Sequence, residues 1–229
     1  MNALLQLDQY LTCLLNGSHS LYADHIAQIA TRPLAWVFLA VALLYVIIRN
    51  NDLRGVLTIV IAIALCITLA DQIASTLFKP WVARFRPTHD PALMYAIDIV
   101  DQYRGGTYGF FSSHAANSMA VATFLALLMR HRVLTVWLYT WALFNCWTRV
   151  YLGVHYVGDL LAGTLCGLLV GWGVYALWRR YARVRAVRAD RVLHGVAHTS
   201  GGYSVTSLRL LMMAFVATYL FIALYALVR

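Results

Sequence analysis

Five or six long hydrophobic runs alternate with short polar segments along the chain. A helix needs about 20 apolar residues to cross the hydrocarbon core of a bilayer, so each run predicts a membrane-spanning helix. The expected spans are Pro33–Ile48, Val56–Phe78, Ala115–Met129, Val133–Trp147, Leu160–Trp178 and Leu208–Val228. The third and fourth runs are short, and we expect each to extend by a turn into its flanking loop.

Residues 1–30 show a different pattern, in which apolar and polar positions are mixed. The apolar positions are Leu4, Leu5, Leu7, Tyr10, Leu11, Leu14 and Leu15, against the polar residues Gln6, Asp8 and Gln9. This spacing predicts an amphipathic helix in the membrane interface, with a weak additional span as the alternative. The segment lacks the basic start of a cleaved signal, so the first full span is expected to act as the insertion signal.

Together these patterns predict an all-α fold. We expect a polytopic membrane bundle of about six transmembrane helices with an N-terminal interfacial amphipathic helix, forming one domain over residues 1–229. Composition agrees, since 62% of the residues are hydrophobic and only 12% are charged. The four cysteines are widely spaced without a CxxC pair, which argues against a disulfide framework and against a zinc site. No cofactor is expected.

The net charge of +9 comes from basic residues that cluster beside the apolar runs. Cations in this position fix topology and contact anionic headgroups, so the expected partner is the lipid bilayer and not nucleic acid. Three alternate loops carry them, namely 49–54, 130–132 and the basic loop 179–207. Because cationic short loops mark the cytoplasmic side, segments 79–113 and 149–155 and both termini should face outwards.

The outward segments contain several cations close to the ends of the spans. Lys79 is the only lysine of the chain, and Arg86 and Arg149 follow in the same outward segments. Ionisable groups at membrane depth are costly and are generally functional or paired. Because guanidinium groups bind phosphate oxygens in pairs, the expected ligand is a phosphate. Arg84 is interpreted either as a further phosphate donor or as an interfacial residue whose charge reaches water.

Two histidines lie near these cations. His155 and Asp159 are four residues apart, so they share one helix face and the carboxylate can hold one imidazole nitrogen. His114 stands at the expected start of a span beside Ser112 and Ser113, whose hydroxyls and amides can donate to an oxyanion. The pattern predicts a nucleophile, His155, oriented by Asp159, and an acid, His114, that protonates the leaving oxygen.

Other chemistries fit the same residues less well. His89, His114, His155 and Asp159 offer a zinc ligand set, but the surrounding cations would repel a metal ion. A serine hydrolase built on one of the two serines is a further alternative, although the cations suit a dianionic phosphate better than a carbonyl. A protein that binds or transports a lipid phosphate without turnover is the non-enzymatic alternative.

Three stretches resemble the signature of the type 2 phosphatidic acid phosphatase (PAP2) superfamily, which reads KxxxxxxRP, PSGH and SRxxxxxHxxxD. In this chain the corresponding stretches are Lys79 to Pro87, Phe111 to His114 and Thr148 to Asp159. Phenylalanine and serine replace the proline and glycine of the second motif, and threonine replaces the serine of the third. The order and spacing of three separated motifs make chance agreement improbable.

The resemblance covers residues 79–159 and implies metal-independent phosphate hydrolysis at an extracytoplasmic site in a helical bundle. It implies that His155 forms a phosphohistidine, that Asp159 orients it, and that His114 protonates the leaving group and then activates water. The phosphoryl oxygens would be held by Lys79, Arg86, Ser112, Ser113 and Arg149. Serine in place of glycine at position 113 is expected to constrain the backbone of the phosphate loop.

Members of this superfamily act on lipid A, undecaprenyl diphosphate or phosphatidylglycerol phosphate. The resemblance therefore implies a lipid phosphatase of the bacterial inner membrane whose site faces the periplasm. The polar segment 88–109 is expected to form a lid or an inert loop, and its compactness favours lipid A or undecaprenyl diphosphate. Asp71, inside the second span, is expected to have a structural role.

Overall fold

The computed structural model describes residues 3–18, 20–185 and 197–228. Over these residues the chain is helical, and the only β pairings are two isolated bridges, Phe85 with Tyr108 and His198 with Ser204. The elements are α1 (Ala3–Leu15), α2 (Leu21–Ala30), η1 (Pro33–Trp36), α3 (Val37–Asn50), α4 (Leu53–Gln72), η2 (Ile73–Phe78), α5 (Lys79–Val82), η3 (Pro87–His89), η4 (Val100–Gln102), α6 (Ser113–Met129), α7 (Arg132–Tyr151), α8 (Val157–Arg185) and α9 (Val205–Val228). The predicted all-α class is confirmed.

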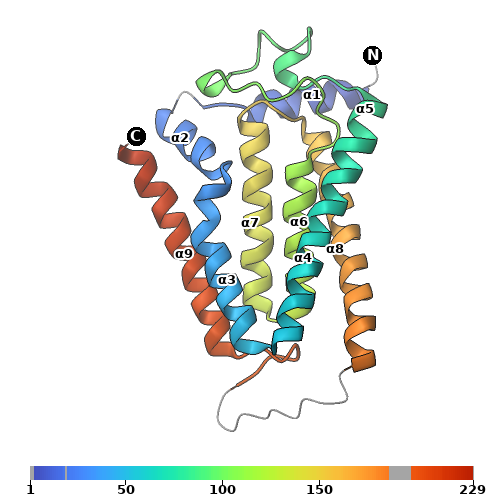
Figure 1. The fold of residues 1–229 in the computed structure, drawn as a ribbon. Helices are drawn as coiled ribbons and strands as arrows, with labels where there is room; N and C mark the ends of the chain where they lie inside the picture. Colours follow the sequence, from blue (N-terminus) through green and yellow to red (C-terminus); the bar gives the residue numbers. More distant parts are fainter. Residues whose placement is uncertain (1–2, 19, 186–196, 229) are drawn as a thin grey trace.

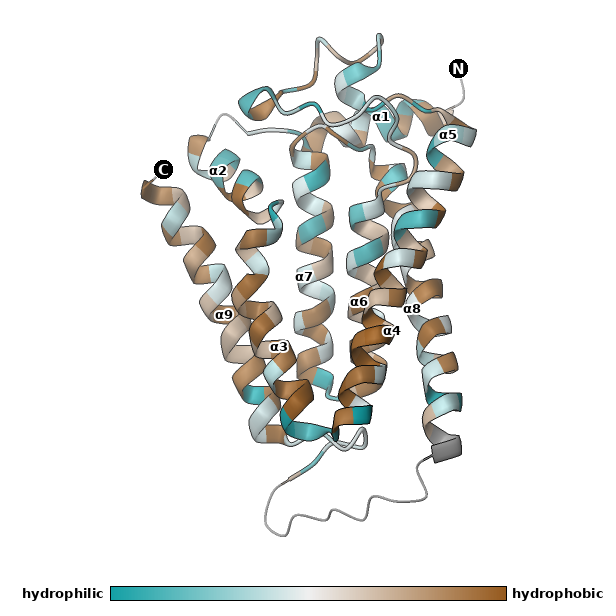
Figure 2. Cartoon of the chain, viewed as in Figure 1, coloured by the Kyte–Doolittle hydropathy of each residue, from teal (hydrophilic) through white to brown (hydrophobic). Residues whose placement is uncertain are grey.

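Six helices of the described chain, α3, α4, α6, α7, α8 and α9, run side by side as a bundle (Figure 1). Four segments are long and apolar enough to cross a membrane, namely Pro33–Asn50, Leu53–Val82, Val157–Ala182 and Val205–Val228. Hydrophobic residues follow the middle of these helices, and hydrophilic residues gather toward the ends (Figure 2). α6 is a shorter apolar helix, and most of its residues are buried by its neighbours.

Three glycines bring α8 against α6. Gly163, Gly167 and Gly171 are spaced four residues apart, so they lie on one face of α8. A Cβ at Gly167 would lie only 2.4 Å from the carbonyl oxygen of Ala116, and the other two positions are similarly tight. Small residues allow such close packing of membrane helices. The contact holds the first turns of α6 and α8 together, where the backbone amide of Ser112 donates to the carbonyl of Asp159 at 3.1 Å.

The short loops with cations lie together at one end of the bundle. Asn50 accepts a hydrogen bond from the amide of Ser204 at 2.8 Å, and Asn51 donates to the hydroxyl of Tyr203 at 3.2 Å, which joins the loop after α3 to the start of α9. The basic loop is shorter than predicted, because α8 continues as a helix to Arg185. Arg188 and Arg191 lie outside the described residues.

The N-terminal segment forms two helices. The chain turns at Gly17, whose φ of +61° is a conformation that glycine adopts without strain. α1 lies across the end of the bundle opposite the cationic loops (Figure 1). Its apolar side chains face away from the protein, with Leu4 79% and Leu14 65% exposed.

Candidate active site

Helix ends far apart in the sequence meet at the end of the bundle that α1 covers. α5 begins with Lys79, α6 begins at Ser113, α7 ends two residues after Arg149, and α8 carries Asp159 in its first turn. The strand-like segment with Arg86 is fixed by two backbone hydrogen bonds, from the amide of Arg86 to Thr107 and from that of Gly109 to Arg84. The helix ends that carry the cations and histidines of the outward segments therefore lie together.

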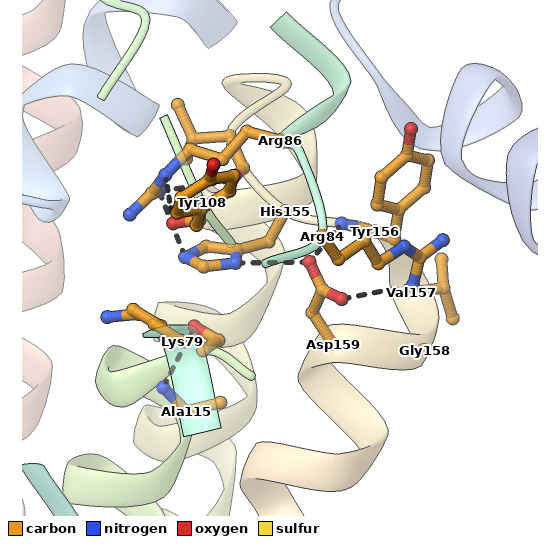
Figure 3. A network of polar contacts seen from close by, with 12 residues as sticks. Lys79, Arg84, Arg86, Tyr108, Ala115, His155, Tyr156, Val157, Gly158 and Asp159 are labelled. Carbon is orange, nitrogen blue, oxygen red and sulfur yellow. Dashed lines mark hydrogen bonds and ion pairs between the residues drawn. The ribbon is translucent and has the colours of Figure 1, made fainter. Parts of the chain in front are cut away.

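His155 sits in the tight loop between α7 and α8 and is 1% exposed (Figure 3). Its Nδ1 lies 3.4 Å from Oδ2 of Asp159, and its Nε2 lies 3.1 Å from the guanidinium of Arg86. A carboxylate only accepts and a guanidinium only donates. The contacts therefore select the tautomer with the proton on Nδ1 and the lone pair on Nε2.

The surroundings of His155 keep its imidazole neutral. Burial, and then the charges of Arg86 and Arg149, hold the pKa of His155 well below its ordinary value. The lone pair on Nε2 is consequently present at neutral pH. A buried, oriented and unprotonated imidazole among cations has the properties that a nucleophile for an anionic group requires.

Asp159 is fully buried and is held from three sides. Its Oδ2 accepts from the backbone amide of Tyr156 at 3.1 Å as well as from His155, and its Oδ1 accepts from Arg84 at 3.1 Å. The bond to Tyr156 is the back-bond of a capping box at the start of α8. The same carboxylate thus caps the helix and orients the imidazole.

Lys79 lies beside the second motif. Its ammonium donates to the hydroxyl of Ser113 at 2.8 Å and to that of Ser75 at 3.2 Å, and Ser75 donates in turn to Asp71 at 3.3 Å. Ser112 is the N-cap of α6, where its hydroxyl accepts from the amide of Ala115 at 3.4 Å. This bond leaves Ser112 engaged in helix capping.

Serine does not strain the backbone at position 113. Ser113 is the first residue of α6, and it is not among the non-glycine residues with positive φ, which are Ala83, Asp101, Gln102 and Arg130. The expected backbone constraint from the missing glycine was therefore wrong, because this position is helical and any L residue adopts that conformation.

Arg149 is 2% exposed, and one of its three side-chain nitrogens has no hydrogen-bond partner. Its guanidinium donates to the hydroxyl of Thr31 and, at 3.1 Å, to that of Tyr103, while its Nε is buried without a hydrogen-bond partner. A buried donor without an acceptor is costly and marks a place for an anion. Tyr103 belongs to segment 88–109, so this segment reaches into the cluster, as a lid would.

His114 occupies the first turn of α6, and its side chain is exposed. Desolvation of the ring, and then the charges of Arg149, His155, Lys79 and Arg86, lower the pKa of His114 to about 3. The ring is therefore neutral at neutral pH, and it lies within electrostatic range of these groups.

The structure adds residues that the motifs did not indicate. The guanidinium of Arg84 bridges Asp159 and Asp8, at 3.1 and 2.8 Å, and lies 3.7 Å from the ring centre of Tyr156. Neither interpretation of Arg84, as an interfacial residue or as a phosphate donor, predicted these contacts with carboxylates. Thr31 and Tyr103, the partners of Arg149, were also missed; each comes from a segment with no motif.

The two other hydrolytic chemistries find little geometric support. Within residues 3–18, 20–185 and 197–228, no three side chains of His, Cys, Asp or Glu are grouped so that they could hold a metal. A serine nucleophile needs a hydrogen bond to its base. Nε2 of His155 instead faces Arg86, and the hydroxyl of Ser113 faces Lys79.

Comparison with known proteins gives one family. Residues 55–183 match the PAP2 superfamily. The chain is 40% identical over 173 residues to a lipid A 4'-phosphatase of Bacteroides thetaiotaomicron, covering 75% of this chain and 77% of that protein. It is 33% identical over 215 residues to a lipid A 4'-phosphatase of Porphyromonas gingivalis, covering 92% and 87%.

A solved structure has a similar fold. The crystal structure of a transmembrane PAP2-type phosphatidylglycerolphosphate phosphatase from Bacillus subtilis superposes with a TM-score of 0.56, covering 83% of this chain and 90% of that one. The sequence identity is 20%, so this likeness concerns the fold alone.

Proposed function

The chain belongs to the PAP2 superfamily. From this membership we propose that it hydrolyses a phosphate monoester of lipid A through a phosphohistidine on His155. Its family and its relatives make it a multi-pass membrane phosphatase. The observation that carries the proposed mechanism is the imidazole of His155, neutral and oriented by Asp159, in contact with Arg86 and within reach of the charge of Arg149.

In the first step the phosphate enters the cluster and takes the donors of Arg86, Arg149 and Lys79. Arg86 then donates to phosphoryl oxygens, which frees Nε2 of His155 to attack phosphorus. Because His114 is neutral among the cations, it takes up a proton when the phosphate binds and its negative charge offsets theirs. The bond from phosphorus to the lipid oxygen then breaks, and this proton passes to that oxygen. The imidazole becomes cationic, and Asp159 stabilises it through the Nδ1 proton.

In the second step His114, now without its proton, accepts a proton from water as that water attacks the phosphohistidine. The bond between phosphorus and Nε2 breaks, the electron pair returns to the imidazole, and inorganic phosphate leaves. The cations hold the spread charge of the equatorial oxygens in both steps, which is the main requirement of phosphoryl transfer.

The proposed substrate follows from the two relatives named lipid A 4'-phosphatase. Lipid A presents a phosphate monoester at the membrane surface, so a site at the helix ends can bind the phosphate while the acyl chains stay in the bilayer. The cationic loops lie at the opposite end of the bundle. The topology rule therefore supports a site that faces the periplasm from the bacterial inner membrane.

We test the proposal by phosphate release from purified protein in detergent. The panel contains lipid A, undecaprenyl diphosphate and phosphatidylglycerol phosphate, each with and without chelator and vanadate. We expect release from lipid A that persists in chelator and is abolished by vanadate, a mimic of the phosphoryl group in transfer. Chelator-sensitive release would instead support a metal-dependent hydrolase, and binding of lipid A without release would support a non-catalytic carrier. Preferential release from another lipid would contradict the proposed substrate alone.

A further inference from the structure

The polar face of α1 contacts the start of α8. Oδ1 of Asp8 accepts from the backbone amide of Gly158 at 2.7 Å, and the hydroxyl of Thr12 accepts from that of Val157 at 3.2 Å. The first amides of a helix have no partner within the helix. Asp8 and Thr12 therefore cap α8 from another helix, about 150 residues away in sequence.

Asp8 is also linked to the imidazole of His155 through two further side chains. Its Oδ2 lies 2.8 Å from the guanidinium of Arg84, which lies 3.1 Å from Oδ1 of Asp159, which in turn contacts His155 (Figure 3 shows the last two contacts). Arg84 and Asp8 are largely shielded, with side chains 22% and 15% exposed. One arginine thus sits between two carboxylates.

We propose that Asp8 is a positioning residue of the phosphatase reaction, which acts through Arg84 on Asp159 and so on His155. Asp8 shares the charge of Arg84 with Asp159. Without it, the whole guanidinium charge would act on Asp159, and Arg84 would lose the second anchor that fixes its direction. The carboxylate of Asp159 would then stabilise the cationic imidazole less well. This inference rests on the function proposed above.

The orientation of α1 explains why the contact is maintained in a membrane. Its apolar side chains, among them Leu4, Leu7 and Leu14, are exposed, whereas Asp8 and Thr12 face the protein. An interfacial helix lies with its apolar face in the lipid. Lipid on one side and α8 on the other thus hold α1 over the site.

The test compares Asp8→Asn with two other variants in purified protein. Asparagine keeps an oxygen for the amide of Gly158 but removes the negative charge beside Arg84. We expect Asp8→Asn to lower kcat about tenfold, as small misplacements of catalytic groups do, with KM changed less than about twofold. The control Gln6→Ala, on an exposed position of the same helix, should stay within about twofold in both. Thr12→Val, which removes a cap without touching Arg84, should lower the unfolding temperature while lowering kcat less than Asp8→Asn.

A double-mutant cycle separates the connection through Arg84 from helix capping. If Asp8 acts through Arg84, Asp8→Asn should have no further effect on kcat in an Arg84→Gln background. Full kcat in Asp8→Asn, an equal loss in Thr12→Val, or effects that multiply in the double variant would overturn the proposal.

A second readout does not depend on turnover. The Nδ1 proton of His155 should give a downfield resonance in protein made with isotope-labelled histidine, identified by its absence in His155→Ala. This resonance should move in Asp8→Asn and stay in place in Gln6→Ala; an unmoved resonance in Asp8→Asn would overturn the proposal. If the unaltered protein released no phosphate, the proposed function would fail, while the resonance would still decide whether Asp8 positions His155.

Discussion

Replacing His155 with alanine should reduce phosphate release from lipid A by about 10⁴-fold or more. The variant lacks the nitrogen that is proposed to attack phosphorus, so the covalent intermediate cannot form on it. The cations would still bind the phosphate, because Lys79 and Arg149 have no contact with the imidazole among their hydrogen bonds. The measurement is single-turnover phosphate release with purified protein, together with lipid A binding.

The matched control is His25→Ala. His25 lies on α2, where its Nδ1 contacts the carbonyl of Ala226 at 3.2 Å, away from the cation cluster. We expect this control to keep its rate within about twofold, since it removes a histidine without touching the site. A His155→Ala protein that unfolds at the usual temperature and still turns over at more than about a tenth of the normal rate would rule out His155 as the nucleophile.

The second large effect is expected from His114→Ala. Loss of a general acid costs about 10²-fold to 10⁴-fold when the leaving group is a poor one, such as the sugar alkoxide of lipid A. The phenolate of an aryl phosphate is a good leaving group and needs no proton to leave. The first step on this substrate should therefore be nearly unaffected in His114→Ala, measured as the burst of phenol in rapid mixing.

The comparison of two leaving groups makes this prediction specific. A structural role for His114 would slow both substrates alike, so equal losses for lipid A and the aryl phosphate would contradict its role as an acid. The later, steady-state rate should fall for both substrates, because the same histidine is proposed to activate the water that cleaves the phosphohistidine.

The hydrophobic runs predicted the bundle, but not the helix ends. Each hydrophobic run indicates how much of a helix can lie in lipid. The polar caps and first turns of the helices lie outside the lipid, so the runs do not indicate them. α4 begins at Leu53 because the side chain of Asp52 accepts from the amide of Gly55 at 2.9 Å. A run that starts at the first apolar residues after Arg54 misses that turn. α8 likewise continues as a helix to Arg185, beyond the end of its apolar run, because the helix does not end where the lipid does.

The motifs predicted which ionisable groups meet, because their spacing reflects the chemistry that they share. Lys79, Arg86 and Arg149 were all assigned to the binding of one phosphate near His155, and their charges act on its imidazole in the structure. The contacts of Asp8 and Tyr103 could not be predicted in this way. Each contact depends on how a separate segment packs against the bundle. α1 places Asp8 against the protein, whereas an isolated amphipathic helix would place it in water.

Trapping the intermediate would show whether Nε2 of His155 accepts the phosphoryl group. Lipid A with a radiolabelled phosphate is mixed with the protein, the reaction is quenched at high pH within the first turnover, and the labelled peptide is mapped. We expect an acid-labile, base-stable phosphate on the peptide that contains His155, absent from His155→Ala. Label on a serine of the second motif, or turnover with no labelled protein at any time, would contradict it.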